Sequence, residues 1–261
     1  MSAEDIVGLL IPVTFLVLMG VEALSNSGRP WPGIPWWRAK GFAFFVVLMT
    51  INAILPSLVP PALAQYHLVD GAQLGVAGGV LLGYPLLALS TALLHRAYHR
   101  YPLLWRIHQL HHAPQRMDMS GAVVFTPLEV VNNVVVSFTV MVFVLGLNPL
   151  AAAIVGYIAV FYGLFQHFNV RTPRWLGYLI QRPESHSVHH RRGFHAYNYS
   201  DFPLWDILMR TFRNPAEFHG EVGFDRAESQ RIGAMLLFKD VNAATLGPGS
   251  RGSANPSTNP A

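Results

Sequence analysis

The sequence predicts an all-α integral membrane protein with about four to five transmembrane helices. Three observations support this fold class. The 261-residue chain is 52% hydrophobic and only 12% charged, whereas ordinary soluble domains carry about 25% charged residues. Several apolar runs reach the roughly 20 residues that a helix needs to cross a bilayer. All 18 Lys and Arg lie in residues 26–40, in residues 95–127 or after residue 168.

Five apolar runs are candidates for membrane crossings, and they cover residues 6–24, 41–64, 72–94, 130–147 and 149–168. The first run follows Glu4 and Asp5 instead of a basic segment, so we interpret it as a retained helix rather than a signal peptide. Pro56, Pro60 and Pro61 should kink or break the second run near its end.

The basic residues predict the orientation. Five crossings with the N-terminus outside place every basic stretch in the cytoplasm, because the 65–71 loop and the 146–149 turn contain no Lys or Arg. This pattern accounts for the net charge of +4, so we predict no nucleic-acid partner. The chain has no cysteine, which excludes disulfides, iron–sulfur clusters and thiolate zinc sites.

Histidines form the main candidate site. The chain has 12, and most fall in HRAYH at the end of the third crossing, in HQLHH and in HSVHH. Spacings of three and four residues put imidazoles on one helix face, and another histidine lies at the end of the fifth crossing in QHFN. Imidazole suits iron, zinc, copper or nickel, and these nine exceed the roughly four ligands of a zinc ion. We therefore predict a cytoplasmic helical cap holding a histidine-rich dimetal site. The candidate ligands are His95, His99, His108, His111, His112, His167, His186, His189 and His190.

These motifs, followed by NYSDFPLWDILMRTF, resemble the fatty acid hydroxylase/sterol desaturase superfamily of membrane non-haem di-iron enzymes over roughly residues 85–215. The resemblance implies two Fe ions, O2 and a separate electron donor of the ferredoxin or cytochrome type. It also implies hydroxylation or desaturation of a fatty acyl, sterol or related lipid, with the nine histidines as ligands. Some members have a further histidine where Arg171 stands. Asn169 and His195 are candidates to replace that ligand or to contact one.

The organisation follows from these motifs. We expect N-terminal transmembrane helices over residues 1–70, a histidine-box catalytic domain with transmembrane helices over 71–215 and a C-terminal cytoplasmic segment over 216–246. Residues 247–261, rich in Gly, Pro, Ser and Asn, should form a disordered tail. The C-terminus has no dilysine-type retrieval signal, which favours a bacterial inner membrane over the endoplasmic reticulum.

Two alternative functions stay open. A membrane zinc enzyme could use the same site, and a metal or haem carrier is the non-enzymatic alternative, although a transport route should place ionisable residues in mid-membrane. No catalytic residue is expected beyond the metal ligands, and lone His67 and His219 should be ordinary histidines. The cavity is expected to be generically apolar, so neither the substrate nor the oligomeric state is predicted.

Two further sets of residues have expected roles. Carboxylates that flank the histidine motifs should orient an imidazole or pair with an arginine, and they are Asp118, Glu184, Asp201 and Asp206. Tryptophans at the ends of the spans should form an interfacial belt, and they are Trp36, Trp37, Trp105 and Trp175.

Overall fold

The computed structural model describes residues 1–25 and 28–242, and this part of the chain is helical with no β-strand. Four helical stretches are long and apolar enough to cross a membrane, and they are Ala3–Leu24, Trp37–Ser57, Gly71–Arg100 and Pro127–Val144. A fifth apolar helix, Pro149–Phe165, is shorter. The predicted all-α fold with four to five apolar helices is confirmed. The predicted tail, 247–261, lies outside the described residues.

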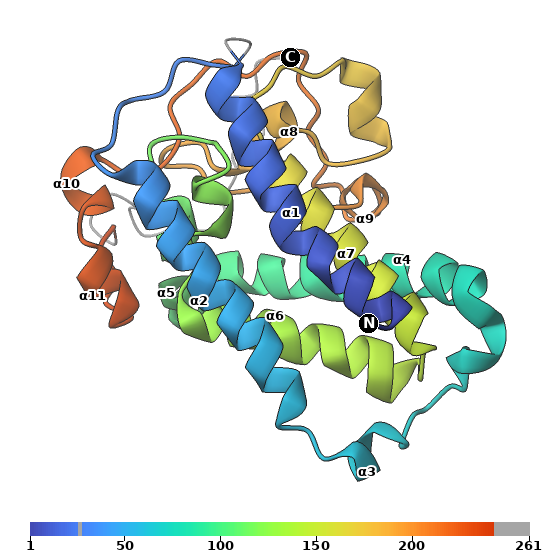
Figure 1. Cartoon of the computed structure of the whole chain (residues 1–261). Helices are drawn as coiled ribbons and strands as arrows, with labels where there is room; N and C mark the ends of the chain where they lie inside the picture. Colours follow the sequence, from blue (N-terminus) through green and yellow to red (C-terminus); the bar gives the residue numbers. More distant parts are fainter. Residues whose placement is uncertain (26–27, 243–261) are drawn as a thin grey trace.

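The five apolar helices alternate in direction. They are α1 (Ala3–Leu24), α2 (Trp37–Ser57), α4 (Gly75–Arg100), α6 (Pro127–Phe138, extended by a π-helix at Thr139–Val144) and α7 (Pro149–Phe165). Figure 1 shows the N-terminus of α1 at the end of the bundle away from α8 (Pro183–His189) and the loops around it. The C-terminal end of α4 and the residues after α7 therefore meet at one end of the bundle, near the start of α6.

Proline sets several helix boundaries. Pro56 lies in the last turn of α2, and the short helix α3 (Pro61–Ala64) follows the break, as the sequence predicted. Tyr101 is extended, with φ −109° and ψ 123°, and Pro102 then starts α5 (Pro102–His112). Proline is favoured at the first helical position because it lacks the N–H that would be unpaired there. The chain thus turns between the first two histidine motifs.

Glycine lets neighbouring helices of the bundle pack closely. The main contacts join α1 to α7, α2 to α6 and α4 to α7. A Cβ added at Gly79 of α4 would lie 2.8 Å from the Cβ of Ala151 in α7, so this glycine allows the backbones to approach closely. Only 6% of the apolar window in α1 is buried inside the protein, which leaves its outer face for lipid.

The cap consists of α5, α8, α9 (Pro203–Leu208) and the C-terminal α10 (Arg226–Ser229) and α11 (Ile232–Leu236), joined by 3-10 turns at Gly121–Val123 and Arg174–Tyr178. Two of the four tryptophans expected in an interfacial belt lie in its core, so that prediction is wrong for them. The indole N–H of Trp37 donates to Asp118, and that of Trp105 donates to Asn242. These partners let both rings be buried, whereas Trp36 and Trp175 are 82% and 63% exposed.

Candidate metal centre

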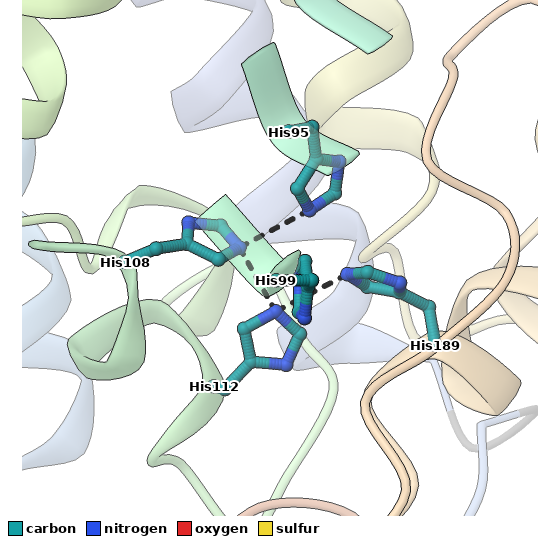
Figure 2. Close-up of side chains that lie close together, drawn as sticks. All are labelled: His95, His99, His108, His112 and His189. Atoms are coloured by element: carbon teal, nitrogen blue, oxygen red, sulfur yellow. Dashed lines mark hydrogen bonds between the residues drawn. The ribbon is translucent and has the colours of Figure 1, made fainter. Parts of the chain in front are cut away.

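The cap end of the bundle gathers nine imidazoles into two groups. The first group contains His95 and His99 from α4, His108 and His112 from α5, and His189 from α8, with all ligand nitrogens within 4.8 Å of one another. Figure 2 shows the five rings converging from separate elements. The Nε2 atom of His108 lies 3.1 Å from that of His95 and 2.9 Å from that of His112. His189 Nε2 lies 3.1 Å from His112 Nε2.

The second group contains His111, His167, His186 and His190, whose ligand nitrogens also lie within 4.8 Å of one another. Within this group, the Nε2 atoms of His186 and His190 are 3.1 Å apart. Adjacent histidines in the chain belong to different groups. Successive residues of an α-helix point about 100° apart, so each H-x-x-H-H motif contributes to both groups.

The nitrogen positions fit metal ions. Two imidazole nitrogens bound to one ion at about 2.0–2.1 Å lie roughly 3 Å apart when they meet at a right angle, which matches the contacts of 2.9–3.1 Å. The Nε2 atoms of His99 and His167 are buried without a hydrogen-bond partner. A buried nitrogen without a partner is costly, and a metal ion would satisfy both.

Hydrogen bonds behind the rings hold several imidazoles in position. The Nδ1 atoms of His95 and His189 lie 2.8 and 2.7 Å from the carbonyl oxygens of Tyr199 and Tyr197. His167 Nδ1 lies 3.0 Å from the carbonyl oxygen of Gly163. A carbonyl accepts only, so these Nδ1 atoms donate, and each Nε2 is left with a lone pair for a metal.

Burial keeps the cap imidazoles neutral. Loss of solvation lowers the pKa of His167 to about 4. Desolvation, followed by repulsion from neighbouring imidazoles, lowers the pKa of five others well below 6.5. Those five are His108, His112, His186, His189 and His190. Because a metal binds the deprotonated ring, these groups are ready to bind at neutral pH.

The two candidates for a tenth ligand lie in different surroundings. His195 is buried, with Nδ1 3.1 Å from Nδ1 of His112, on the side of that ring away from the other first-group nitrogens. This position suits a contact that orients His112. The amide oxygen of Asn169 accepts a hydrogen bond from the backbone N–H of Arg29 at 2.9 Å, and its amide N–H donates to the carbonyl oxygen of Arg29 at 3.0 Å. Lone His67 and His219 are exposed, outside both groups.

Sequence reasoning missed Glu129 in the first turn of α6. Its Oε1 lies 2.5 Å from Nδ1 of His108, and both side chains are buried. Thr126 caps this turn by accepting a hydrogen bond from the backbone N–H of Glu129. The available signal was a carboxylate at the edge of an apolar span, since ionisable residues in membrane segments are usually functional.

The four carboxylates that flank the motifs bind other groups. Two of them pair with arginines, as expected. Asp118 pairs with Arg116, and Glu184 pairs with Arg29 and Arg182. Asp206 accepts from backbone N–H groups of the 199–200 loop, and Asp201 accepts from the amide of Gln166 at 3.0 Å. The imidazoles are instead held by Glu129 and by backbone carbonyls.

A cavity of about 260 Å³ opens beside both histidine groups. His95 and His108 of the first group and His111, His167 and His186 of the second line it. It extends between α2, α4, α6 and α7, where its wall is largely apolar but includes several polar side chains. The expected generic apolar cavity is therefore only partly right.

Comparison with known proteins places this geometry in a family. Residues 80–211 match the fatty acid hydroxylase family, and this segment contains all nine histidines of the two groups. The chain belongs to the fatty acid hydroxylase family. Ornithine lipid hydroxylase OlsE of Rhizobium tropici is 28% identical over 189 residues, which cover 70% of this chain and 54% of that protein. The chain thus spans about half the length of this curated relative. No solved structure matches the chain.

Membership in the fatty acid hydroxylase family gives the apolar helices their context. Four helices long enough to span a bilayer, in a family of membrane enzymes, identify the chain as an integral membrane protein. The predicted superfamily is confirmed. The assignment of individual histidines as ligands stays a prediction that the two groups support.

Proposed function

We propose that this chain is a membrane-bound, O2-dependent di-iron hydroxylase that oxidises a C–H bond of a lipid. The observation that carries the proposal is the pair of all-histidine groups that face one cavity between membrane helices. Family membership supports hydroxylation, and the similarity to an ornithine lipid hydroxylase supports a membrane lipid as the substrate.

The ligand set favours iron over zinc. The first group offers five imidazoles, more than the four ligands that zinc usually takes. The second group offers four and borders the cavity, which leaves room for a reactant. Nine nitrogen ligands divided between two ions are consistent with two Fe ions, each held by neutral imidazoles.

Two bound iron ions would supply the reduction and cleavage of O2. In the overall reaction one oxygen atom enters the C–H bond as a hydroxyl group. The other oxygen atom leaves as water, which consumes two electrons and two protons. A separate ferredoxin- or cytochrome-type protein would supply the electrons, and an acidic donor would be steered to the basic residues at the cap end.

The chain's own residues would orient the ligands and keep out bulk water. Glu129 and the carbonyls of Tyr199, Tyr197 and Gly163 hold four imidazoles by Nδ1. Such contacts fix the ring orientation and the tautomer of a metal ligand. The apolar wall of the cavity would place a lipid chain beside the centre and exclude water from it.

The test is the source of oxygen in the product. The chain is expressed in a bacterial host grown under 16O2 or 18O2, and the lipids are compared by mass spectrometry with those of cells that carry His111→Ala. We expect a hydroxylated lipid that takes up one 18O atom and disappears in His111→Ala, while His219→Ala, at an exposed site, keeps the product. A product that also forms without oxygen would support the zinc alternative, and an alkene product would indicate desaturation.

We also propose a bacterial inner-membrane location with the N-terminus outside and the histidine groups on the cytoplasmic side. The distribution of basic residues supports this orientation. Residues 71–215 would form the catalytic unit, with residues 1–70 and 216–246 flanking it. The family match over residues 80–211, which lies within the proposed catalytic unit, supports this division.

A further inference from the structure

Polar side chains form a stripe on the cavity side of α6. Glu129, Asn133 and Ser137 are spaced by four residues and all line the cavity, because residues four apart lie on the same face of an α-helix. The helix is regular over this range, Pro127–Phe138. Val135, which belongs to another face, is 51% exposed, as expected for a residue that contacts lipid.

Asn133 and Ser137 differ from most polar residues of the spans. Thr50, Asn52, Ser90 and Thr91 each donate to a carbonyl of their own helix, which is the usual way to satisfy a polar side chain in a membrane helix. Asn133 and Ser137 make no side-chain hydrogen bond within residues 1–25 and 28–242. Both are half-buried.

Both side chains line the cavity, and a polar group left unpaired against hydrocarbon is costly, so a lipid that enters the cavity binds better when it offers them a hydrogen-bond partner. The Asn133 amide both donates and accepts, and the Ser137 hydroxyl does the same. Asn52 of α2 also lines the cavity, and its amide N–H donates to the carbonyl oxygen of Leu48 in its own helix, which leaves its amide oxygen as an acceptor. Together these groups complement an uncharged group that donates and accepts.

The spacing of the stripe also gives the separation of its three residues along α6. Glu129 is hydrogen-bonded to His108 of the first group, and each step of four residues rises about 6 Å along the helix. Asn133 and Ser137 therefore lie roughly 6 and 12 Å further along α6 than Glu129, which contacts the first histidine group.

We propose that the cavity selects a lipid that carries an amide or hydroxyl group beside Asn133 and Ser137, about 6–12 Å along α6 from Glu129, and that these two side chains bind it. A fatty acyl chain with only methylene groups at this position would leave both side chains unpaired. The inference rests on the proposed function for the reaction, but the selection itself is a binding property that can be measured without turnover.

The test compares three lipid probes of equal length, with an amide, an ester or only methylene groups at the same position. Their dissociation constants are measured on the metal-loaded protein in detergent, without reductant, by displacement of a fluorescent amide lipid. We expect the wild-type protein to bind the amide probe about tenfold more tightly than the methylene probe, with the ester probe between them, because the ester only accepts.

Asn133→Leu and Ser137→Ala should each reduce this preference to about threefold, and the double variant should abolish it. Val135→Leu and Thr139→Val, at exposed positions of the same span, should keep it. Metal content and melting temperature serve as checks that the variants fold. Equal binding of the three probes by the wild-type protein would overturn the inference, and so would an unchanged preference in the double variant.

The outcomes separate the two proposals. An O2-dependent hydroxylated product without a binding preference would refute the selection and leave the hydroxylase standing. A binding preference that Asn133 and Ser137 control, in a protein that forms no O2-dependent product, would refute the hydroxylase and leave the selection standing.

Discussion

Histidines that are adjacent in the chain belong to different groups. His111 and His112 are adjacent, yet His111 joins a group of four imidazoles and His112 joins a group of five. The same division separates His190 from His189. The groups differ in how many ligands remain when one is removed, and this difference can be measured.

We therefore expect unequal effects from two adjacent substitutions. His111→Ala leaves three imidazoles in its group and should lower the metal content from about two ions per chain toward one. His112→Ala leaves four and should retain more metal. Elemental analysis of purified, iron-reconstituted protein measures both, with His219→Ala as the control. Equal losses in the two variants would argue against the two-group arrangement.

Glu129 orients His108, and its removal should weaken metal binding. Loss of a hydrogen bond behind a ligand typically costs about 10–100-fold in metal affinity or activity, which is the range we expect for Glu129→Leu. Glu129→Gln keeps an acceptor and should recover part of the loss. Competition with a chelator measures the affinity. Glu221→Gln, whose side chain is 75% exposed, is the matched control and should bind metal like the wild-type protein.

The buried imidazoles should make the metal-free protein sensitive to acid. Burial lowers the pKa of His167 to about 4 and that of His195 to about 3, whereas an unfolded histidine titrates near 6.5. The unfolded state therefore binds protons that the folded state excludes. Stability should be full above about pH 6.5 and fall by about 1.4 kcal/mol per pH unit for each such group below it, until the pH reaches the pKa of that group in the folded state.

Melting temperatures of the chelated protein between about pH 7.5 and 5 test this window. His195→Gln should show a shallower decline than the wild-type protein, and His219→Gln should follow the wild-type curve, since His219 is exposed. A melting temperature that stays constant over this range would show that burial of these two rings does not control the acid response.

At the scale of elements, close packing of α4 on α7 positions the first histidine motif. A Cβ at Gly79 would meet the Cβ of Ala151 at 2.8 Å, and neither atom can rotate away. The helix axes would have to separate, and α4 carries His95 and His99 at its end.

Gly79→Ala should therefore destabilise the protein by about 1–3 kcal/mol, the usual cost of overpacking. Gly156→Ala on α7 is the matched control, because a Cβ there meets nothing within 4 Å. It should be neutral or raise stability by up to about 1 kcal/mol. Thermal unfolding in one detergent compares them, and a Gly79→Ala protein as stable as Gly156→Ala would contradict the packing argument.

At the scale of the whole molecule, the orientation in the membrane can be tested with single cysteines, since the chain has none. Ser2 lies before α1, and Gln230 lies at an exposed position of the cap. Each is replaced by cysteine in a separate variant. An impermeant maleimide should label Ser2→Cys in intact spheroplasts and Gln230→Cys only after lysis. The reverse pattern would place the histidine groups outside the cytoplasm.

The sequence predicted the helices and the histidine motifs because both depend on local rules. A crossing needs a continuous apolar run, and spacings of three and four bring imidazoles to one helix face. The break after Pro56 and the tight turn before Pro149 follow from proline chemistry. Trp37 and Trp105 were misplaced because burial of an indole depends on a distant partner for its N–H.

By itself the sequence thus determined that the chain is a helical membrane protein with histidines gathered at one end of the bundle. Only the tertiary structure decided how the nine imidazoles divide between two groups, that Glu129 supports His108 across 21 residues of chain, and that α6 turns a polar stripe toward the cavity. The physical reason is that spacing along one helix fixes which residues share a face. The packing of several helices decides which groups that face meets.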